Sequence, residues 1–281
     1  MTKINKKLVS NFLAFEKFNN LDKIILQQRK FWPIVRYAFF YYLYDEKQYS
    51  YEKKLRKKLD LSIFIKVIKG SLSLKNLFGR CDILIYDYGR SQKIGNVQTN
   101  PLVYALTKSI PKKYKICIVT KDYNSINDTK DKKINIYLIY KLINVLKKIF
   151  IKAQSISQIK KKLEKKILKS FRKKINIESI IYDVFCHQIS LGIIFEIIFI
   201  IKKPKVIFYS DNAEMSDIIY RAKKRNILTV DVQHSIISNL KILYQHNELV
   251  DKSYLSDFIL TYSDYWNKFY SNCYNKKSVG N

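Results

Sequence analysis

The chain has 281 residues, a formal net charge of +30, and 47% hydrophobic and 14% aromatic residues. This length predicts two domains or one large one, with enough apolar residues for a buried core. The hydrophobic content excludes an intrinsically disordered chain, and the 6 glycines and 4 prolines exclude collagen-like and linker sequences. The positive charge predicts an anionic partner, for which nucleic acid, anionic lipid and phosphorylated substrates are the candidates.

The four cysteines do not predict a metal centre. They stand far apart, and no Cys or His pair has the spacing of a zinc site. Dispersed cysteines in a chain without a signal peptide indicate a reducing cytoplasm. The most apolar run, residues 189–201, is shorter than the roughly 20 residues of a membrane span and contains Glu196. We therefore expect a buried helix there, and only peripheral contact with a membrane.

Residues 1–75 are expected to form a helical N-terminal segment. Apolar residues recur at a ragged helical spacing from Phe12 to Ile25, and Pro33 suits the first turn of a second helix. The second helix continues through the aromatic residues 37–44. A helix so rich in aromatic residues is typical of a protein core, and the alternative is a position at a membrane interface.

From residue 76 the pattern becomes an alternation of strands and helices. Strands are expected at residues 82–86, 114–120, 134–139, 204–210, 227–232 and 257–262. Helices are expected at residues 102–109, 177–200, 214–225 and from 264 onward. This alternation predicts an α/β fold over residues 76–281, in which a Rossmann-like parallel sheet is flanked by helices.

A basic helical insertion interrupts the alternation at about residues 141–175. The window contains 13 lysines and arginines but only one acidic residue, Glu164. Its apolar residues recur from Leu142 to Phe171 at helical spacing, which predicts a two-faced helix. Its basic face is either a solvated helix surface or a surface that lies on anionic lipid or faces an anionic acceptor.

Polar residues follow four of the predicted strands. Ligands of open parallel sheets bind beyond the carboxyl ends of the strands, so these residues are candidates for a functional site. Asp211 and Asn212 can in addition cap the helix that begins near Glu214. We assign six of the strand-end residues to substrate binding: Arg90, Asp211, Asn212, Glu214, Gln233 and Ser235.

His234 is the candidate catalytic residue. It directly follows a strand, and an imidazole can take a proton from an acceptor hydroxyl near neutral pH. The alternative is a structural histidine. Arg90, beside Gly89, can clamp a phosphate or a carboxylated sugar, or form a surface ion pair. His187, inside the apolar helix, is interpreted as a hydrogen-bonded core residue, and His246 as a loop residue.

Several common catalytic motifs are missing from the sequence. It contains no P-loop and no dinucleotide-binding glycine motif, and it has no metalloprotease, nucleophile-elbow or kinase motif. We expect no metal and no bound cofactor.

Two motifs suggest a family. They are residues 230–235, with the sequence VDVQHS, and residues 257–266, with the sequence DFILTYSDYW. With them, the segment from Pro204 to Phe269 resembles the end of the N-terminal domain in bacterial GT-B-type glycosyltransferases of capsule and lipopolysaccharide assembly. Residues 32–36, 82–90 and 99–102 also look similar to this family. The resemblance spans most of the chain through short motifs.

The resemblance implies two Rossmann-like domains that face each other across a cleft. The first holds a lipid-linked saccharide acceptor and the second holds a nucleotide-sugar donor. His234 is then the catalytic base, and it also resembles the histidine of polymerases that transfer polyol phosphate to wall teichoic acid. Ser235 departs from the glycine usual in the family, and the donor domain would begin near Asn281. The chain is therefore expected to represent a single GT-B half, as a truncated product, a gene fragment, one of two chains or a non-catalytic remnant.

The sequence predicts a glycosyltransferase of bacterial surface polysaccharide synthesis. The expected location is the cytoplasm, peripheral on the anionic inner face of the plasma membrane. One alternative is a polyol-phosphate transferase of the teichoic-acid type. The other is a non-catalytic basic protein that binds membrane surfaces or nucleic acid. Nucleic acid is not the expected partner, because no helix-turn-helix, zinc-finger or RRM signature occurs.

Overall fold

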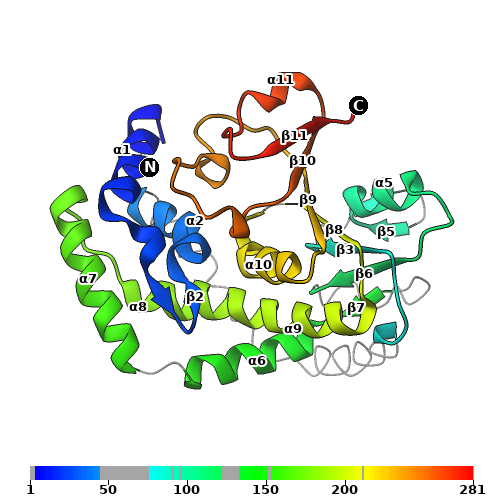
Figure 1. The fold of residues 1–281 in the computed structure, drawn as a ribbon, viewed down its shortest axis with the longest axis horizontal. Helices are drawn as coiled ribbons and strands as arrows, with labels where there is room; N and C mark the ends of the chain where they lie inside the picture. The colour runs from blue at the N-terminus through cyan, green and yellow to red at the C-terminus, as the bar shows by residue number, and fades with distance from the viewer. Residues whose placement is uncertain are drawn as a thin grey trace.

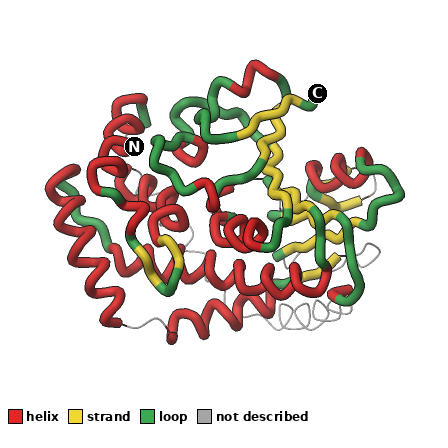
Figure 2. Tube along the Cα trace, in the orientation of Figure 1, coloured by secondary structure: helices red, strands yellow, loops and turns green. Residues whose placement is uncertain are grey.

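The computed structural model describes residues 4–44, 76–89, 92–94, 97–121, 133–150, 153–210 and 212–280. These residues form a parallel sheet with helices packed against it, and a helical layer that contains the N-terminal helices (Figures 1 and 2). The chain is therefore a mixed α/β protein with a Rossmann-like sheet, as the sequence predicts for this fold class.

The main sheet has the strand order β11–β10–β9–β8–β3–β6–β7, and every neighbouring pair is parallel. Its strands are β3 (Ile83–Asp87), β6 (Ile116–Thr120), β7 (Lys133–Asn135), β8 (Val206–Tyr209), β9 (Leu228–Val232), β10 (Phe258–Thr261) and β11 (Asn275–Ser278). The central strand β3 is buried along its whole length. Such a strand needs apolar residues on both faces, which is why the sequence shows it as a continuous apolar run.

Two details of the sheet differ from the sequence prediction. The strand expected at residues 134–139 ends at Asn135, because the Asn135 side chain accepts a hydrogen bond from the Tyr137 amide and begins the helix α6 (Tyr137–Phe150). Strand β11 was not predicted, and its polar sequence forms an edge of the sheet beside β10. Two short hairpins, β1 (Ile25–Leu26) with β2 (Arg29–Lys30) and β4 (Gln92–Ile94) with β5 (Val97–Thr99), were also not predicted.

The helices around the sheet occupy the predicted places. They are α5 (Pro101–Ser109), α9 (Cys186–Lys202), α10 (Ser216–Lys224) and α11 (Asp264–Asn267). The prediction that Asn212 caps the helix after β8 is wrong. Asn212 begins a short 3₁₀ turn, η5 (Asn212–Glu214), and α10 starts after Met215 without a side-chain cap. Asp211 lies outside the described residues.

The N-terminal residues form helices that share one hydrophobic core with the basic insertion. Helices α1 (Lys6–Asn19) and α2 (Phe31–Tyr44) pack with α7 (Ala153–Phe171) and α8 (Ile177–Ile180). The aromatic residues of α2 are core residues, since Phe39 and Phe40 are fully buried. The core interpretation of that aromatic helix is confirmed. Residues 45–75 of the predicted helical segment lie outside the described residues.

The apolar helix that the sequence predicts at residues 177–200 is longer than expected. Helix α8, a π-helical turn at Ile181–Phe185 and α9 form one stretch, Ile177–Lys202. Among the described residues, it is the one helix long and apolar enough to cross a membrane, and 67% of its most apolar window is buried in the protein. The expectation that this apolar segment is too short to span a membrane is therefore wrong. The prediction of a mostly buried helix is confirmed. In Figure 1, α9 runs beside α6, and the two helices are in contact.

Candidate functional site

The strand order creates a topological switch point between β3 and β8. From β3 the chain proceeds to β6 and β7 on one side, and it then returns through α6, α7 and α9 to β8 on the other side. Loops diverge at such a point and leave a crevice beyond the carboxyl ends of the strands, where open α/β sheets bind their ligands. The loops that follow β3, β6 and β8 are therefore the first place to look for a site.

Four ionisable side chains meet there, and we call them the switch-point cluster: Lys121, Tyr140, His187 and Glu214. The Glu214 carboxylate accepts a hydrogen bond from His187 Nε2, with an N–O distance of 2.9 Å, and another from the Lys121 ammonium group. The other ring nitrogen of His187 is hydrogen-bonded to the Tyr140 hydroxyl. The four residues come from the loop after β6, from α6, from α9 and from η5. The topology thus gathers four distant parts of the chain.

The cluster combines partial burial with access to solvent. The side chains of Lys121, His187 and Glu214 are 19%, 18% and 28% exposed. Burial opposes ionisation of Glu214, but the charges of His187 and Lys121 outweigh it and hold the pKa of the carboxyl well below its ordinary value. Glu214 is therefore a carboxylate at neutral pH. The Lys121 ammonium also lies 4.6 Å from the centre of the Tyr88 ring.

The order of these groups permits proton transfer. A carboxylate that is hydrogen-bonded to an imidazole orients the ring, and the other ring nitrogen can then exchange a proton with a hydroxyl. Tyr140, His187 and Glu214 have this order of hydroxyl, imidazole and carboxylate. Tyr140 is 7% exposed, so the hydroxyl is the buried end of this series of hydrogen bonds. Glu214, Lys121 and His187 each keep part of their side chain exposed, so an incoming ligand meets these members first.

The loop after β3 lies at the same edge of the sheet and is held by hydrogen bonds of its own. The Asp87 carboxylate is buried and accepts hydrogen bonds from the Gly89 amide at 3.0 Å and from the Asn100 side chain at 2.9 Å. Gly89 has a φ of 80°, a left-handed conformation that strains any residue with a Cβ. Arg90 follows directly and lies outside the described residues, so its predicted role stays a prediction.

The loop after β9 forms a second polar group on the neighbouring strand. The Gln233 side chain accepts a hydrogen bond from the Tyr262 amide at 3.2 Å and donates one to the Ser235 carbonyl at 3.0 Å. Lys241 contacts the Ser235 hydroxyl at 3.3 Å. These bonds tie the loop to β10 and hold the half-buried His234 at the end of β9. Gln233 and Ser235 therefore position this loop.

Sequence reasoning found only one member of the switch-point cluster, Glu214. His187 is interpreted from the sequence as a hydrogen-bonded core residue. Its hydrogen bonds are present, to Glu214 and Tyr140, but its side chain is 18% exposed and belongs to the cluster. Lys121 was overlooked, although it directly follows a predicted strand and the rule of strand ends applies to it. Asn212 has its backbone in η5, and Asp211 lies outside the described residues.

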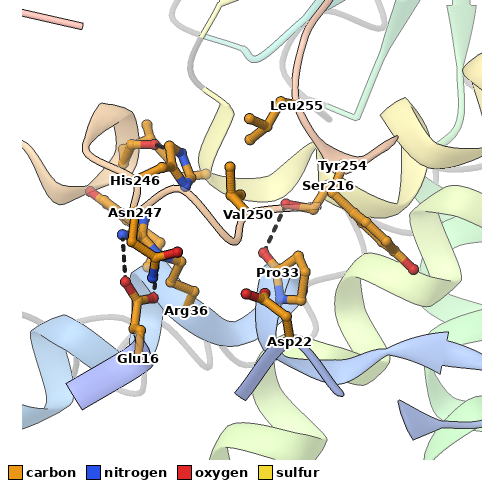
Figure 3. A pocket seen from close by; sticks show the side chains of 13 residues that line it. Glu16, Asp22, Pro33, Arg36, Ser216, His246, Asn247, Val250, Tyr254 and Leu255 are labelled. Carbon is orange, nitrogen blue, oxygen red and sulfur yellow. Dashed lines mark hydrogen bonds and ion pairs between the residues drawn. The ribbon is translucent and has the colours of Figure 1, made fainter. Parts of the chain in front are cut away.

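A cavity of about 30 Å³, lined by both charged and apolar side chains, lies between α2 and the loop that follows β9 (Figure 3). Here the Arg36 guanidinium pairs with the Glu16 carboxylate, with an Nη2–Oε2 distance of 3.1 Å, and donates to the Ile242 carbonyl at 2.7 Å. Burial, and then the charge of Arg36, lower the pKa of His246 well below its ordinary value, so its ring is neutral. The volume suits about one water molecule. We interpret the cavity as part of the structural contact between α2 and the loop that follows β9.

Asp22, beside this cavity, gives a testable pH dependence. Burial, and then the charge of Glu16, raise its pKa from 3.8 to about 6. The folded state therefore binds this proton more tightly than the unfolded state, and stability falls as the pH rises from about 4 to about 6. Asp22→Asn removes this loss, and we expect it to raise the free energy of unfolding by about 1 kcal/mol at pH 7.5, after allowance for solvent screening.

Urea unfolding at pH 7.5 and at pH 4 checks this expectation. The gain should be absent at pH 4, where the carboxyl of the unaltered protein is protonated in the folded state. Glu248→Gln is the control, because the Glu248 side chain is 89% exposed. An equal gain at both pH values would contradict the assignment.

Comparisons of the chain with protein-family models, with curated proteins and with solved structures gave no match. Within the described residues, no group of three or more His, Cys, Asp and Glu side chains could hold a metal ion. A fold of this kind serves many activities, so function is inferred from the site itself.

Proposed function

We propose that this chain forms the acceptor-binding domain of a GT-B-type glycosyltransferase of bacterial surface polysaccharide synthesis. The observation that carries the proposal is the row of ionisable groups along the carboxyl edge of the parallel sheet. His187, Glu214 and Lys121 lie at the switch point, and His234 follows the neighbouring strand β9. The motifs at residues 230–235 and 257–266 supply the reaction class.

The proposed reaction transfers a sugar from a nucleotide-activated donor to a hydroxyl of a lipid-linked saccharide. The acceptor oxygen forms a bond to the anomeric carbon, and the bond from that carbon to the nucleoside diphosphate breaks. The diphosphate leaves with the electron pair of the broken bond. The acceptor hydroxyl loses its proton to His234, whose loop is held in place by Gln233.

The switch-point cluster fits the binding of an acceptor that carries a negative charge. A carboxylate accepts hydrogen bonds from sugar hydroxyls, and Glu214 remains ionised at neutral pH. The Lys121 ammonium is a point charge that attracts a phosphate or a carboxylate on the saccharide. His187 orients Glu214 and acts as a positioning residue. The formal charge of +30 raises the local concentration of such an acceptor.

Two substitutions test the proposal by separating kcat from KM. The assay uses a complete enzyme, in which a donor-binding domain accompanies this chain, with labelled nucleotide sugars and a lipid-linked saccharide. We expect His234→Ala to lower kcat by about 100-fold or more with little change in acceptor KM. We expect Glu214→Gln to raise the acceptor KM about tenfold, because the variant loses a charged acceptor of hydrogen bonds. Glu248→Gln is the control for loss of an exposed carboxylate.

Saccharide binding is measured separately from transfer. Titration calorimetry of the chain with a soluble saccharide diphosphate should show binding that Glu214→Gln weakens and His234→Ala leaves unchanged. Unaltered kcat in His234→Ala would remove that residue from the reaction. A chain that neither transfers sugar nor binds the saccharide diphosphate would overturn the proposed function.

A further inference from the structure

Helix α6 carries an aliphatic stripe on its outer surface. Leu138, Leu142, Val145 and Leu146 are 45%, 61%, 57% and 42% exposed. The opposite face of the helix packs into the sheet core through Tyr140 and, less deeply, through residues 139 and 143. A solvated helix usually has polar side chains on its outer face. Helix α6 is thus apolar on both faces, and Figure 1 shows the helix along the lower part of the view, beside α9.

Helix α7 differs from α6, although the two helices belong to the same basic insertion. Its apolar residues Ile156, Ile159, Leu163 and Ile167 are buried in the core that it shares with α1 and α2. Its other residues are mostly lysines that contact solvent, and Leu168 is its one exposed large aliphatic side chain among the described residues. The sequence gives both helices an amphipathic pattern, and the structure shows that the α7 stripe already has a partner within the chain. This leaves the α6 stripe as the surface to be explained.

The charge around the stripe indicates what covers it. Helix α6 contains three lysines and no acidic residue, and the exposed Lys141 directly precedes Leu142 of the stripe. Lysine side chains beside an apolar stripe can extend to lipid phosphates while the aliphatic side chains enter the acyl boundary. A second copy of the chain is disfavoured as the partner, because each copy carries +30 and the copies repel each other. Each lysine near an anionic bilayer surface adds favourable energy to the contact.

We propose that α6 docks the protein on an anionic lipid bilayer, with the stripe of Leu138, Leu142, Val145 and Leu146 at the boundary between headgroups and acyl chains. The docking does not depend on the proposed transferase activity. It has a spatial consequence, since Tyr140 lies on the inner face of the same helix and contacts His187. The Tyr140 end of the switch-point cluster then lies about one helix diameter, or about 10–12 Å, from the bilayer surface.

Vesicle co-sedimentation of the full chain tests the proposal. The probes are phosphatidylcholine vesicles with and without phosphatidylglycerol, at low and at high salt. We expect binding to the anionic vesicles that weakens at high salt, and Leu142→Ser/Val145→Ser should reduce the partition coefficient at least tenfold. Ile236→Ser is the matched control, because Ile236 is 81% exposed and lies outside the stripe.

A second measurement remains informative if the double variant does not fold. Leu142→Cys is labelled with an environment-sensitive fluorophore in a Cys273→Ser background, since the other three cysteines are buried. Vesicles should shift the emission to the blue, and the same label at Ile236→Cys should show no shift. Vesicle binding that is unchanged in the double variant, or a label at residue 142 that stays in water on the vesicle, would overturn docking through α6. Failure of the chain to bind anionic vesicles would do so too, and would point to a protein as the occupant.

Discussion

Arg36→Met is expected to lower the free energy of unfolding by about 3–5 kcal/mol. The Arg36 and Glu16 side chains are only 7% and 3% exposed and form an ion pair. Without the guanidinium, Glu16 keeps its bond from the Trp32 indole at 2.6 Å but becomes an uncompensated buried charge. The carbonyl oxygens of Ile242 and Gln245 also lose their donor, so the loop after β9 loosens from α2.

A double variant separates the two contributions. Arg36→Met/Glu16→Met removes both charges, and we expect it to recover most of the lost stability, because paired removal leaves no buried charge. Urea unfolding measures both variants. The control is Lys17→Met, since the exposed pair of Lys17 with Glu248 should contribute less than about 1 kcal/mol. A single variant as stable as the unaltered chain would contradict the assigned role.

Gly192→Ala is expected to destabilise the protein by about 3 kcal/mol or more. A Cβ at residue 192 would lie 1.8 Å from Asp217 Oδ2 and 2.8 Å from Arg221 Nε. Asp217 is fully buried and bonds to Arg29 at 2.9 Å and to Arg221 at 2.6 Å, so it cannot move without breaking an ion pair. Alanine is favoured over glycine in a helix by about 1 kcal/mol. The steric overlap with Asp217 therefore outweighs the helix preference for alanine, and the substitution lowers the free energy of unfolding.

Thermal or urea unfolding of Gly192→Ala gives the result directly. Ile197→Ala serves as the control, because Ile197 is on the same helix and is 44% exposed. A second comparison is Gly192→Ala/Asp217→Ala, which relieves the overlap. We expect the double variant to lose less stability than the sum of the two single losses. Additive losses, or a Gly192→Ala protein within 1 kcal/mol of the unaltered chain, would show that α9 and α10 separate at little cost.

The central strands of the sheet were predictable because each appears as an apolar run between polar segments, and β3 is buried along its whole length. The edge strand β11 was not, because Asn275, Lys276, Lys277 and Ser278 contain no apolar residue and pair only through the backbone of β10. The end of β7 was misplaced for a local reason. The side chain of Asn135 begins a helix there, and this bond competes with the strand pattern of the apolar residues that follow.

The candidate site was predictable only for a residue whose own position in the sequence, after the end of a strand, marks it as a site residue. Glu214 follows a strand, and the rule of strand ends finds it. His187 is far from it in sequence, inside an apolar helix, and only the packing of α9 against the sheet brings the two together. The pair of Glu16 with Arg36 is similar, because a contact between two separate helices leaves no periodic pattern in the sequence. Long-range pairs of this kind require the fold.

The position of β3 in the sheet also sets the order in which the chain can fold during synthesis. Strand β3 pairs with β6 on one side and with β8 on the other, and β8 follows only after α6, α7 and α9 have been made. At 5–20 residues per second, the ribosome needs on the order of ten seconds to pass from β3 to β8. Until β6 is made both edges of β3 are open, and from then until β8 is made the edge toward β8 stays open. The nascent chain is therefore most exposed to wrong pairing before β8 emerges, and most of the protein must be synthesised before its sheet can close.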